Sequence, residues 1–461
     1  MSSATTSATS KPIPQLPGLP ILGNALDFQR DRLELLGRVA RECGEIGSFR
    51  IGPKSVVVIT SAELVQELMV EKGEMIHRGP FFDTFIPVLG KHSLLTIGGT
   101  YHRQQRKLQM PAFGHRRMPK YAAAMMECIR QVVDELRDGQ HVDLGEEMAR
   151  LARLITAKTL FTIDEGPLVN HFQKAIFVVE QHMARMMSNV VPMPLWLPTS
   201  ANHRARIAIT EMRKRADEII AEYRARNQDM GDLLSMLLQA QDENGAPLSD
   251  EQLRDHTVTM YIAGQETTAV GLTWMLIHMA KNPEVQAKAR QEVDEALQGR
   301  NPTYEDLPQL PYCLQVVKEA LRLSPPAGAF GRETLEEMNI GEYRVPAKQF
   351  ILISPHALHR VPKYYPDPER FIPERFLPEE EKARPRSAYL PFATGVHTCV
   401  GNYFAMMEMQ LTLAYMLQRM YLELKPGQDI QPKLYITVKP SSSDFIIRYR
   451  TDQRQRSLAA S

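Results

Sequence analysis

The sequence predicts a mainly α-helical protein with small β-sheets, and three observations support this fold class. Helical patterning dominates residues 119–240, and one run of 32 residues extends without a break from Asp250 to Lys281. Strand patterns, in contrast, are short and are bounded by glycine and proline turns. The chain contains no internal repeat, no G-x-G-x-x-G and no Walker motif, so no nucleotide-binding domain is expected.

Composition restricts the possible partners and compartment. The 461 residues include 55 basic and 54 acidic side chains, a balance that gives no reason to expect a nucleic-acid partner. The four cysteines have no C-x-x-C spacing, which argues against a disulfide framework or a structural zinc site and favours a reducing cytoplasm: Cys43, Cys128, Cys313 and Cys399. No stretch is long and apolar enough to predict a signal peptide or a transmembrane anchor. We expect a monomer.

The two ends of the chain are expected to lie outside one central domain. Residues 1–18 are predicted as a disordered or extended tail, residues 19–450 as a single domain, and residues 451–461 as a polar, disordered tail. Residues 11–23 (KPIPQLPGLPILG) are too rich in proline for a helix. They form either a stiff lead-in on the surface of the fold or a simple linker.

The next segments are predicted as a small sheet followed by an aromatic loop. Residues 46–51 and 55–60 flank Gly52-Pro53-Lys54 as two strands, and residues 62–72 have helical spacing. Residues 78–97 read as a loop because Gly79, Pro80, Pro87 and Gly90 interrupt them. Its apolar side chains either line a ligand pocket or pin the loop to the core: Phe81, Phe82, Phe85, Ile86, Val88 and Leu89.

Two features within the helical region carry chemical interest. His102 and Arg106 stand four residues apart, so both can donate to one anionic group, although such a pair is usually part of a solvated face. Residues 190–200 (VVPMPLWLPTS) interrupt the helices with an apolar, proline-broken segment. This segment is either a lid over a pocket or a hydrophobic surface contact.

The long run that follows breaks helix preferences at its centre. Ser249 to Gln252 form a capping-box signature, and the helix should span about 48 Å. Ala263-Gly264-Gln265-Glu266-Thr267-Thr268 place a glycine, a carboxylate and hydroxyls where a buried helix should be apolar. Either Thr267 bonds back to the Ala263 carbonyl and bends the helix, or the small pair makes room for a ligand while Glu266 and Thr267 move protons.

The C-terminal third combines a further helix, an ion pair and short strands. A helix is predicted from Pro311 to Leu323, with Glu319 and Arg322 close enough to pair, and Arg375 follows in a proline-rich region. Strands are predicted at residues 350–354, 434–438 and 445–449.

One cysteine stands in a loop that delivers it to the start of a helical run. Cys399 follows Phe392, Gly395 and His397 and precedes Gly401, near the positive N-terminal end of a helix that can stabilise a thiolate. The glycines allow a flat ring to approach the backbone. Taken alone, Cys399 is more often a small buried hydrophobe, and as a thiolate it is a metal ligand suited to haem iron.

Four motifs in this order make the chain similar to the cytochrome P-450 family of haem-thiolate monooxygenases, in its soluble bacterial form. Phe392 to Gly401 match F-x-x-G-x-[R/H]-x-C-x-G, and Ala263 to Thr268 match [A/G]-G-x-[D/E]-T-[T/S]. Glu319 to Arg322 match E-x-x-R, and Pro373 to Phe376 match P-E-R-F.

The resemblance implies the cytochrome P-450 fold, in which haem b lies between the long central helix and the cysteine loop-helix. Cys399 would be the axial ligand of the iron, with Phe392, Gly401 and Ala263 against the haem. Glu266 and Thr267 would deliver protons during oxygen activation. Glu319, Arg322 and Arg375 would form the buried structural triad that supports the cysteine loop.

The family positions also imply contacts to the two haem propionates and to a substrate. The propionate donors would be His102, Arg106, Arg332 and His397, where His102 replaces a common tryptophan and His397 a common arginine. The substrate-facing residues would be Phe81, Phe82, Phe85, Ile86, Ala263, Ala327, Ala329 and Phe330, together with the lid at residues 190–197. Because nearly all are apolar, the implied substrate is a terpenoid, fatty acid, steroid or polyketide.

Electrons would come from a ferredoxin and an NAD(P)H-dependent ferredoxin reductase, because no redox module is recognisable after Cys399. Basic side chains on the cysteine side either attract an acidic ferredoxin or belong to an ordinary solvated surface: Lys107, Arg116, Arg117, Lys382, Arg384 and Arg386. The expected reaction is O2-dependent hydroxylation or epoxidation. The alternatives are a reductase-independent isomerase, dehydratase or peroxygenase and, in another class, a non-catalytic haem sensor.

Overall fold

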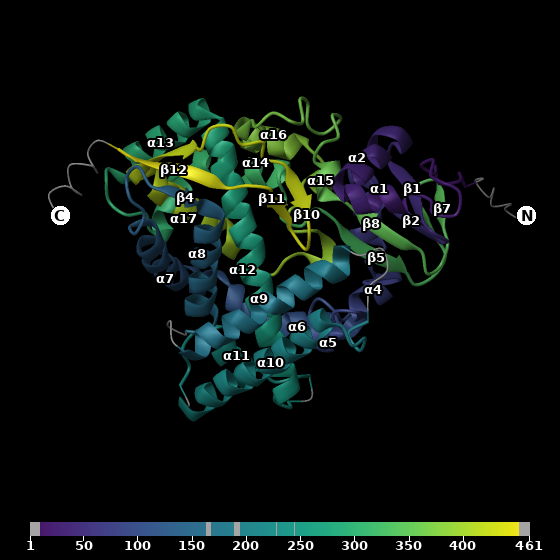
Figure 1. Cartoon of the computed structure of the whole chain (residues 1–461), viewed down its shortest axis with the longest axis horizontal. Coiled ribbons are helices and arrows are strands. Elements are labelled where there is room, and N and C mark those ends of the chain that lie inside the picture. Colours follow the sequence, from purple (N-terminus) through teal and green to yellow (C-terminus); the bar gives the residue numbers. More distant parts are fainter. Residues whose placement is uncertain (1–9, 163–166, 189–193, 227, 244, 451–461) are drawn as a thin grey trace, which may run out of the picture.

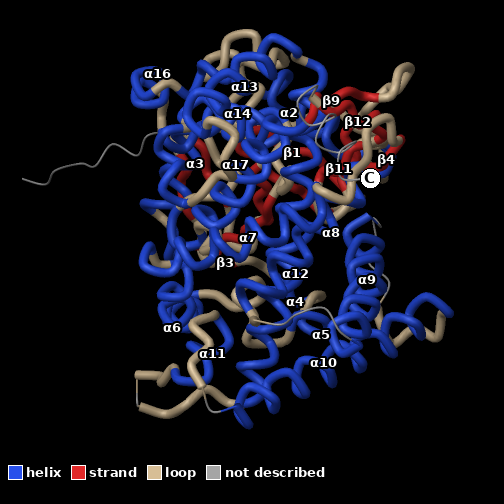
Figure 2. Tube along the Cα trace, turned by 90° about the vertical axis from the view of Figure 1, so that its left-hand side faces the viewer, coloured by secondary structure: helices blue, strands red, loops and turns tan. Residues whose placement is uncertain are grey.

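The computed structural model describes residues 10–450 except 163–166, 189–193, 227 and 244. The molecule has a flattened, three-cornered outline, with helices over most of its area and a mixed sheet at the corner nearest the N-terminus (Figure 1). Small sheets near the C-terminus complete it, as the red segments in Figure 2 show. The predicted fold class, mainly α with small β-sheets, is confirmed.

The α-helices are α1 Ala25–Arg30, α2 Arg32–Cys43, α3 Ala62–Gln66, α4 Pro80–Asp83, α5 Ile86–Leu89, α6 Gly99–Gln109, α7 Met118–Val133, α8 Leu144–Leu160, α9 Pro167–Ser188, α10 Ser200–Arg226, α11 Leu233–Gln239, α12 Asp250–Lys281, α13 Pro283–Leu297, α14 Pro311–Leu323, α15 Pro355–Leu358, α16 Pro378–Ala383 and α17 Asn402–Arg419. The strands are β1 Ile46–Ile51, β2 Lys54–Ile59, β3 Ile76–His77, β4 His141–Asp143, β5 Phe330–Thr334, β6 Met338–Ile340, β7 Tyr343–Val345, β8 Phe350–Ile353, β9 Met420–Leu424, β10 Pro432–Leu434, β11 Val438–Pro440 and β12 Asp444–Tyr449.

Helix α12 crosses the middle of the molecule and organises the core around it (Figure 1). Its N-terminus carries the predicted capping box. The Ser249 hydroxyl accepts a hydrogen bond from the Gln252 N–H, and the Gln252 side-chain oxygen accepts one from the Ser249 N–H. Buried side chains surround most of its length, as expected of a helix with no solvent face.

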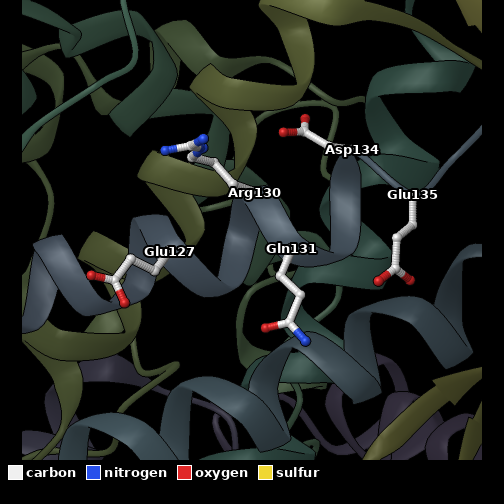
Figure 3. A pocket seen from close by; sticks show the side chains of 5 residues that line it. All are labelled: Glu127, Arg130, Gln131, Asp134 and Glu135. Atoms are coloured by element: carbon white, nitrogen blue, oxygen red, sulfur yellow. The ribbon is translucent and has the colours of Figure 1, made fainter. Parts of the chain in front are cut away.

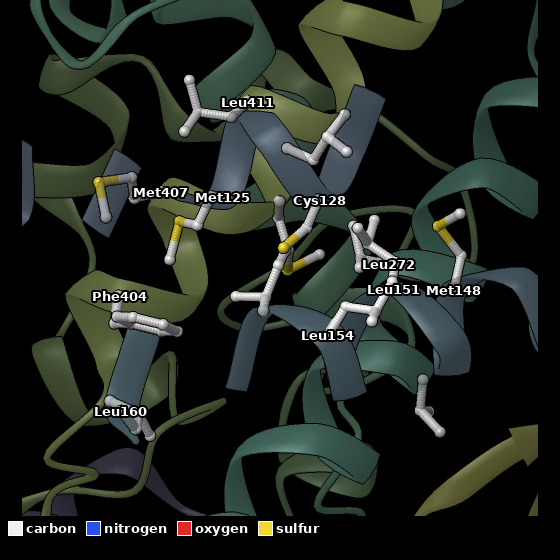
Figure 4. Packing of buried hydrophobic residues seen from close by; sticks show 14 of the residues in the cluster. Met125, Cys128, Met148, Leu151, Leu154, Leu160, Leu272, Phe404, Met407 and Leu411 are labelled. Atoms are coloured by element: carbon white, nitrogen blue, oxygen red, sulfur yellow. The ribbon is translucent and has the colours of Figure 1, made fainter. Parts of the chain in front are cut away.

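The main hydrophobic core lies where α7, α8, α12 and α17 meet. Figure 4 shows its packing, with Met125 and Cys128 of α7 beside Leu151 of α8 and Leu272 of α12. These side chains are less than 10% exposed. Each buried side chain of this size stabilises the fold by about 1.5–3 kcal/mol, so this packing fixes both α12 and the start of α17.

The N-terminal corner is a five-stranded sheet in the order β1-β2-β8-β5-β3. Strands β1 and β2 form the predicted hairpin, with Ile46 opposite Ile59, and β2 runs parallel to β8. The sheet carries Arg332 on β5, whose partner residue on β8 is Ile351.

The proline-rich lead-in follows the outer edge of this sheet. Leu16 is fully buried, and its N–H donates to the Ser48 carbonyl while the Ser48 N–H donates to Pro14. Gly23 forms a further bridge to Ile51. These residues are therefore a fixed part of the sheet edge and not a simple linker.

Two predictions about local structure were wrong. Residues 434–438 are not a strand, because β10 ends at Leu434 and β11 begins at Val438, so most of the stretch is the turn of a hairpin. The segment after Arg78 is not only a loop, since α4 and α5 form within it, each starting with proline in its first turn. In the part of the chain that the structure describes, no helix is long and apolar enough to cross a membrane.

Candidate functional site

The cysteine loop ends in a short 3-10 turn, Gly395–His397, before α17 begins at Asn402. The Cys399 N–H donates to the Phe392 carbonyl over 2.9 Å, which folds the loop back on itself. Burial raises the pKa of the Cys399 thiol, whereas the Gly401 N–H and the Arg106 charge lower it. Cys399 nevertheless retains exposed surface. A residue that is crowded by protein atoms yet accessible borders an opening inside the molecule.

The two glycines of this loop have different requirements. Gly395 has φ +69°, and an added Cβ would lie 2.1 Å from the Met69 carbonyl oxygen. Glycine is therefore required at position 395 because of the nearby Met69 backbone. The predicted reason, the approach of a flat ring to the backbone, does not apply at this position. At Gly401 an added Cβ would meet only Phe113, at 3.8 Å, so space remains on that side.

The middle of α12 borders an opening as well. Thr267 is exposed although its neighbours Gln265 and Thr268 are only 5% and 6% exposed. Ala263, one turn earlier, is half-buried on the same side of the helix. The combination of a buried helix with one accessible face at Ala263 and Thr267 marks the side where a ligand can lie.

The Thr267 hydroxyl donates to the Ala263 carbonyl over 2.7 Å, which is the bond that the simpler interpretation of this threonine predicts. Thr257 and Thr273 make the same bond four residues back, but both are buried. The bond therefore follows from the residue type, and exposure distinguishes Thr267 from the others.

Gly264 has a packing role that the sequence did not reveal. A Cβ at this position would lie 3.3 Å from the hydroxyl of Thr156 on α8. The missing side chain thus lets α8 approach α12.

Glu266 is held by the β10–β11 hairpin. Its Oε1 atom lies 2.9 Å from the Lys439 Nζ atom and accepts a bond of 3.1 Å from the Thr437 hydroxyl. Lys439 could not be found from the sequence, because 173 positions separate it from Glu266 and none of the four family motifs includes it.

Basic side chains gather beside the cysteine loop. The His102 Nε2 and His397 Nδ1 atoms lie 3.3 Å apart, and Arg106 donates to the Thr398 carbonyl over 2.5 Å. Arg78 lies 3.4 Å from the same His397 nitrogen, and its Nε atom is buried without a partner. Arg78 was also missed, because a lone arginine before Gly79-Pro80 belongs to no motif.

The charges in this cluster oppose one another. The pKa of Arg78 is lowered to about 9, first by burial and then by the Arg332 and Arg106 charges, and burial lowers the pKa of Arg332 to about 10. Burial followed by the nearby arginines lowers the pKa of His102 to about 4 and that of His397 to about 2, so both imidazoles are neutral at pH 7. Among the described residues, no carboxylate pairs with Arg78, Arg106 or Arg332. Such a cluster is suited to an anion with more than one charge.

The structure brings Glu319, Arg322 and Arg375 together. Glu319 and Arg322 are fully buried and form two hydrogen bonds of 2.6 and 2.8 Å, and the Arg375 Nε atom lies 3.4 Å from Glu319. Arg322 also donates to the backbone carbonyls of His359, Pro368 and Arg370. The triad therefore ties α14 to the irregular chain that leads into the cysteine loop.

The predicted substrate residues fall into separate groups. Phe81, Phe82 and Phe85 pack edge to face or tilted, with ring centroids 5.6–6.3 Å apart, and extend the main core. Ile86 of α5 is half-buried. Ala327 is also half-buried, whereas Ala329 and Phe330 pack against the two clusters around the N-terminal sheet. Residues 190–193 of the predicted lid lie outside the described residues.

Two surface hollows lie apart from these residues. One, of about 470 Å³, is lined by polar and charged side chains of α7 and the turn after it that point in different directions (Figure 3). The other, of about 580 Å³, lies against α6 and α11. Neither is lined by Cys399 or Thr267.

Comparison with known proteins decides the family. The family model described as Cytochrome P450 matches residues 13–447, which is nearly the whole chain. The chain belongs to the cytochrome P450 family. It is 37% identical to cyclooctatin synthase and 34% identical to cyclooctat-9-en-7-ol 5-monooxygenase, both from Streptomyces melanosporofaciens. The matches cover 90% and 89% of this chain and 91% and 89% of those proteins.

The fold agrees with this membership. The crystal structure of the cytochrome P450DA heme domain superposes with a TM-score of 0.88 at 27% identity, over 96% of this chain and 99% of that chain. The protein is therefore a P450 monooxygenase, an oxidoreductase, with haem b as its cofactor.

The described residues fit haem b. Haem b presents an iron that accepts a thiolate ligand and two propionates that need cationic or hydrogen-bonding partners. The chain supplies an accessible cysteine and a cluster of arginines and neutral histidines that lacks carboxylates, and the Arg78 and Arg332 Nε atoms are buried without partners.

Proposed function

We propose that this P450 inserts oxygen into a lipophilic terpenoid, with Cys399 as the axial ligand of the haem iron. The observation that carries the proposal is that Cys399 and Thr267, from segments 132 positions apart, both keep exposed surface, Cys399 in a half-buried loop and Thr267 on an otherwise largely buried helix. The anion-binding cluster around Arg78 and His397 lies beside the cysteine. His102, Arg106, Arg332 and His397 would contact the propionates, and Phe392, Gly401 and Ala263 would lie against the ring.

The role of each group in the proposed reaction follows from its chemistry. When bound, thiolate-ligated haem supplies an iron that binds O2 and favours cleavage of the O–O bond. The Thr267 hydroxyl, which faces the opening, donates or accepts a proton there. Glu266, one position earlier, exchanges protons with water and is oriented by Lys439 and Thr437. The aromatic group at Phe81, Phe82 and Phe85 orients an apolar substrate and excludes water.

The substrate class rests on the similar proteins and on the apolar residues. The name cyclooctat-9-en-7-ol 5-monooxygenase describes oxygen insertion into an unsaturated alcohol. The phenylalanine group of this chain suits a hydrocarbon of that kind. Hydroxylation or epoxidation of a terpenoid hydrocarbon or alcohol is therefore favoured over the oxidation of a charged compound.

Electrons are proposed to arrive from a ferredoxin and its NAD(P)H-dependent reductase. Arg116 and Lys107 are exposed, and the His115 ring lies 5.2 Å from the Tyr403 ring at the start of α17. A basic surface beside the cysteine helix suits an acidic partner. Arg384 does not belong to this surface, because its guanidinium stacks over Tyr365 and Phe376.

The spectrum of the reduced, carbon monoxide-bound protein tests the ligand. Wild type should show the red-shifted Soret band of thiolate ligation, and Cys399→Ser should abolish it. Cys128→Ser, at a buried cysteine of α7, is the matched control and should retain the band. A red-shifted band in Cys399→Ser would overturn the assignment.

Electron dependence separates the competing activities. A monooxygenase forms product only with NAD(P)H, a ferredoxin system and O2. Product formation without electrons would instead support an isomerase, dehydratase or peroxygenase. If no compound from a panel of terpenoids, fatty acids, steroids and polyketides alters the haem spectrum or is oxidised, a haem sensor becomes the better interpretation.

A further inference from the structure

A second carboxyl group lies beside Glu266 and has no part in the proposed reaction. Glu180 on α9 accepts a hydrogen bond of 2.7 Å from the side-chain amide of Gln265 on α12. Gln265 is 5% exposed, and its Oε1 atom is buried without a partner. A neutral carboxylic acid can pair with a primary amide through two hydrogen bonds, so a protonated Glu180 would supply the donor that Gln265 lacks.

The two carboxyl groups have different surroundings. Glu266 has a cation at 2.9 Å and a hydroxyl at 3.1 Å, both from the β10–β11 hairpin. Among the described residues no cation forms an ion pair with Glu180, and its hydrogen-bond partner is the neutral Gln265 amide. Protonation is therefore favoured at Glu180, the carboxyl group that lies against a neutral amide.

The charged and titratable groups around Glu180 come from three other elements. The pKa of Glu180 is raised to about 7, first by burial and next by the Glu266 charge. Gln265 from α12, Lys439 from β11 and Arg153 from α8 lower it. Tyr261 of α12 also lies close enough to feel the Glu180 charge, and burial raises its own pKa to about 12, so it stays neutral.

We propose that Glu180 is a positioning residue for proton delivery: with Lys439 and Gln265 it holds one proton beside Glu266 and so sets the pH range in which the Glu266–Thr267 pair works. The role rests on the proposed function of that pair. Each proton that Glu266 passes toward the Thr267 hydroxyl is replaced by one taken up from water, so the pair returns to its starting charge. Glu180 comes from α9, Gln265 from α12 and Lys439 from the β10–β11 hairpin. This arrangement therefore forms only when all three elements are in place.

Two substitutions should move the titration of the pair in opposite directions. Glu180→Gln removes the carboxyl group that holds the proton and leaves a neutral amide in its place. Lys439→Met removes a cation that lowers the pKa of Glu180. The Lys439 side chain is 46% exposed, so its loss should be tolerated by the fold and its effect should be the smaller of the two.

The first measurement is an infrared pH titration of the holoenzyme that follows the C=O band of protonated carboxyl groups. Wild type should show a band that disappears near neutral pH. Glu180→Gln should lose it, or move its midpoint down by on the order of one pH unit, and Lys439→Met should move it upward. Glu284→Gln, at an exposed glutamate of α13, is the control and should leave the band unchanged.

The second measurement is the pH profile of product formed per NAD(P)H. Its fall on the alkaline side should move to lower pH in Glu180→Gln and to higher pH in Lys439→Met. Shifts in the same direction, or slower turnover in both variants with unmoved profiles, would overturn the proposal and leave Glu180 as a packing residue. The infrared band is read whether or not a substrate is oxidised, so failure of the monooxygenase proposal remains distinguishable.

Discussion

Replacing Arg78 with methionine should have opposite effects on the haem-free and haem-bound protein. Arg78 lies among Arg106, Arg332 and two neutral histidines, with its Nε atom unpartnered and its pKa lowered to about 9. One pKa unit corresponds to about 1.4 kcal/mol, and a buried charge without its partner typically costs about 3–5 kcal/mol. The haem-free fold therefore carries a penalty that a pair of propionates would remove.

Arg78→Met keeps an apolar stem and deletes the charge. It also removes the contact of the guanidinium with the Phe82 ring at 5.7 Å, which is worth about 1 kcal/mol. We expect the haem-free variant to be more stable than haem-free wild type by about 2 kcal/mol in urea unfolding, since the relieved penalty exceeds the lost contact. A charge-assisted hydrogen bond to a propionate contributes about 1.5–3 kcal/mol. Transfer of haem to excess apomyoglobin should therefore be about 10- to 100-fold faster from Arg78→Met than from wild type.

The matched control is Arg103→Met, at an exposed arginine of α6 that pairs with Glu74. It should change the free energy of unfolding of the haem-free protein by no more than about 1 kcal/mol, and the rate of haem transfer by no more than the corresponding factor. If Arg78→Met destabilises the haem-free protein and leaves the rate of haem transfer unchanged, the anion-binding interpretation of this cluster is refuted.

Three further predictions concern the reaction and its surroundings. Thr267→Ala should lower product formed per NAD(P)H and raise hydrogen peroxide release, whereas Thr273→Ala, which loses the same backbone bond at a buried site, should leave that ratio unchanged. Arg116→Glu should raise the ferredoxin concentration needed for half-maximal turnover without altering substrate-binding spectra, and Arg204→Glu, an exposed arginine of α10, serves as control; equal effects would argue against docking at Arg116. Asp306→Asn should destabilise the protein by about 1–3 kcal/mol at pH 7, because Arg300 holds the pKa of Asp306 at about 2; the deficit should shrink as pH falls from about 4 to 2, and a pH-independent deficit would contradict this cause.

The sequence predicted those parts of the molecule that local patterns determine. The bounds of α12 and α14 follow from caps and prolines, and both helices begin and end at the predicted residues. The fold class was correct for the same reason, since a mostly helical pattern with short strands leaves few alternatives. The turn at residues 435–437 was mistaken for a strand because its residues favour strands, while the pairing of β10 with β11 set the turn.

The contacts that define the chemistry could not be predicted, because they join distant positions. Arg78 reaches the cysteine loop across 319 positions, and Glu180 reaches Gln265 across 85. Neither belongs to a motif, so only the fold brings them together. Gly264 shows the opposite case, since its position was evident but its neighbour, Thr156 on α8, could be found only in three dimensions.

The lead-in that borders β1 has a consequence for association between molecules. β1 is the outer strand of its sheet, and an uncovered outer strand is a template on which a second molecule can add its own strand. Pro14 and Leu16 occupy backbone groups of Ser48 that would otherwise be open, and the prolines around them cannot extend the ladder further. Affinity tags placed before Lys11 should therefore be harmless, whereas trimming past Leu16 should yield a protein that aggregates in a concentration-dependent way.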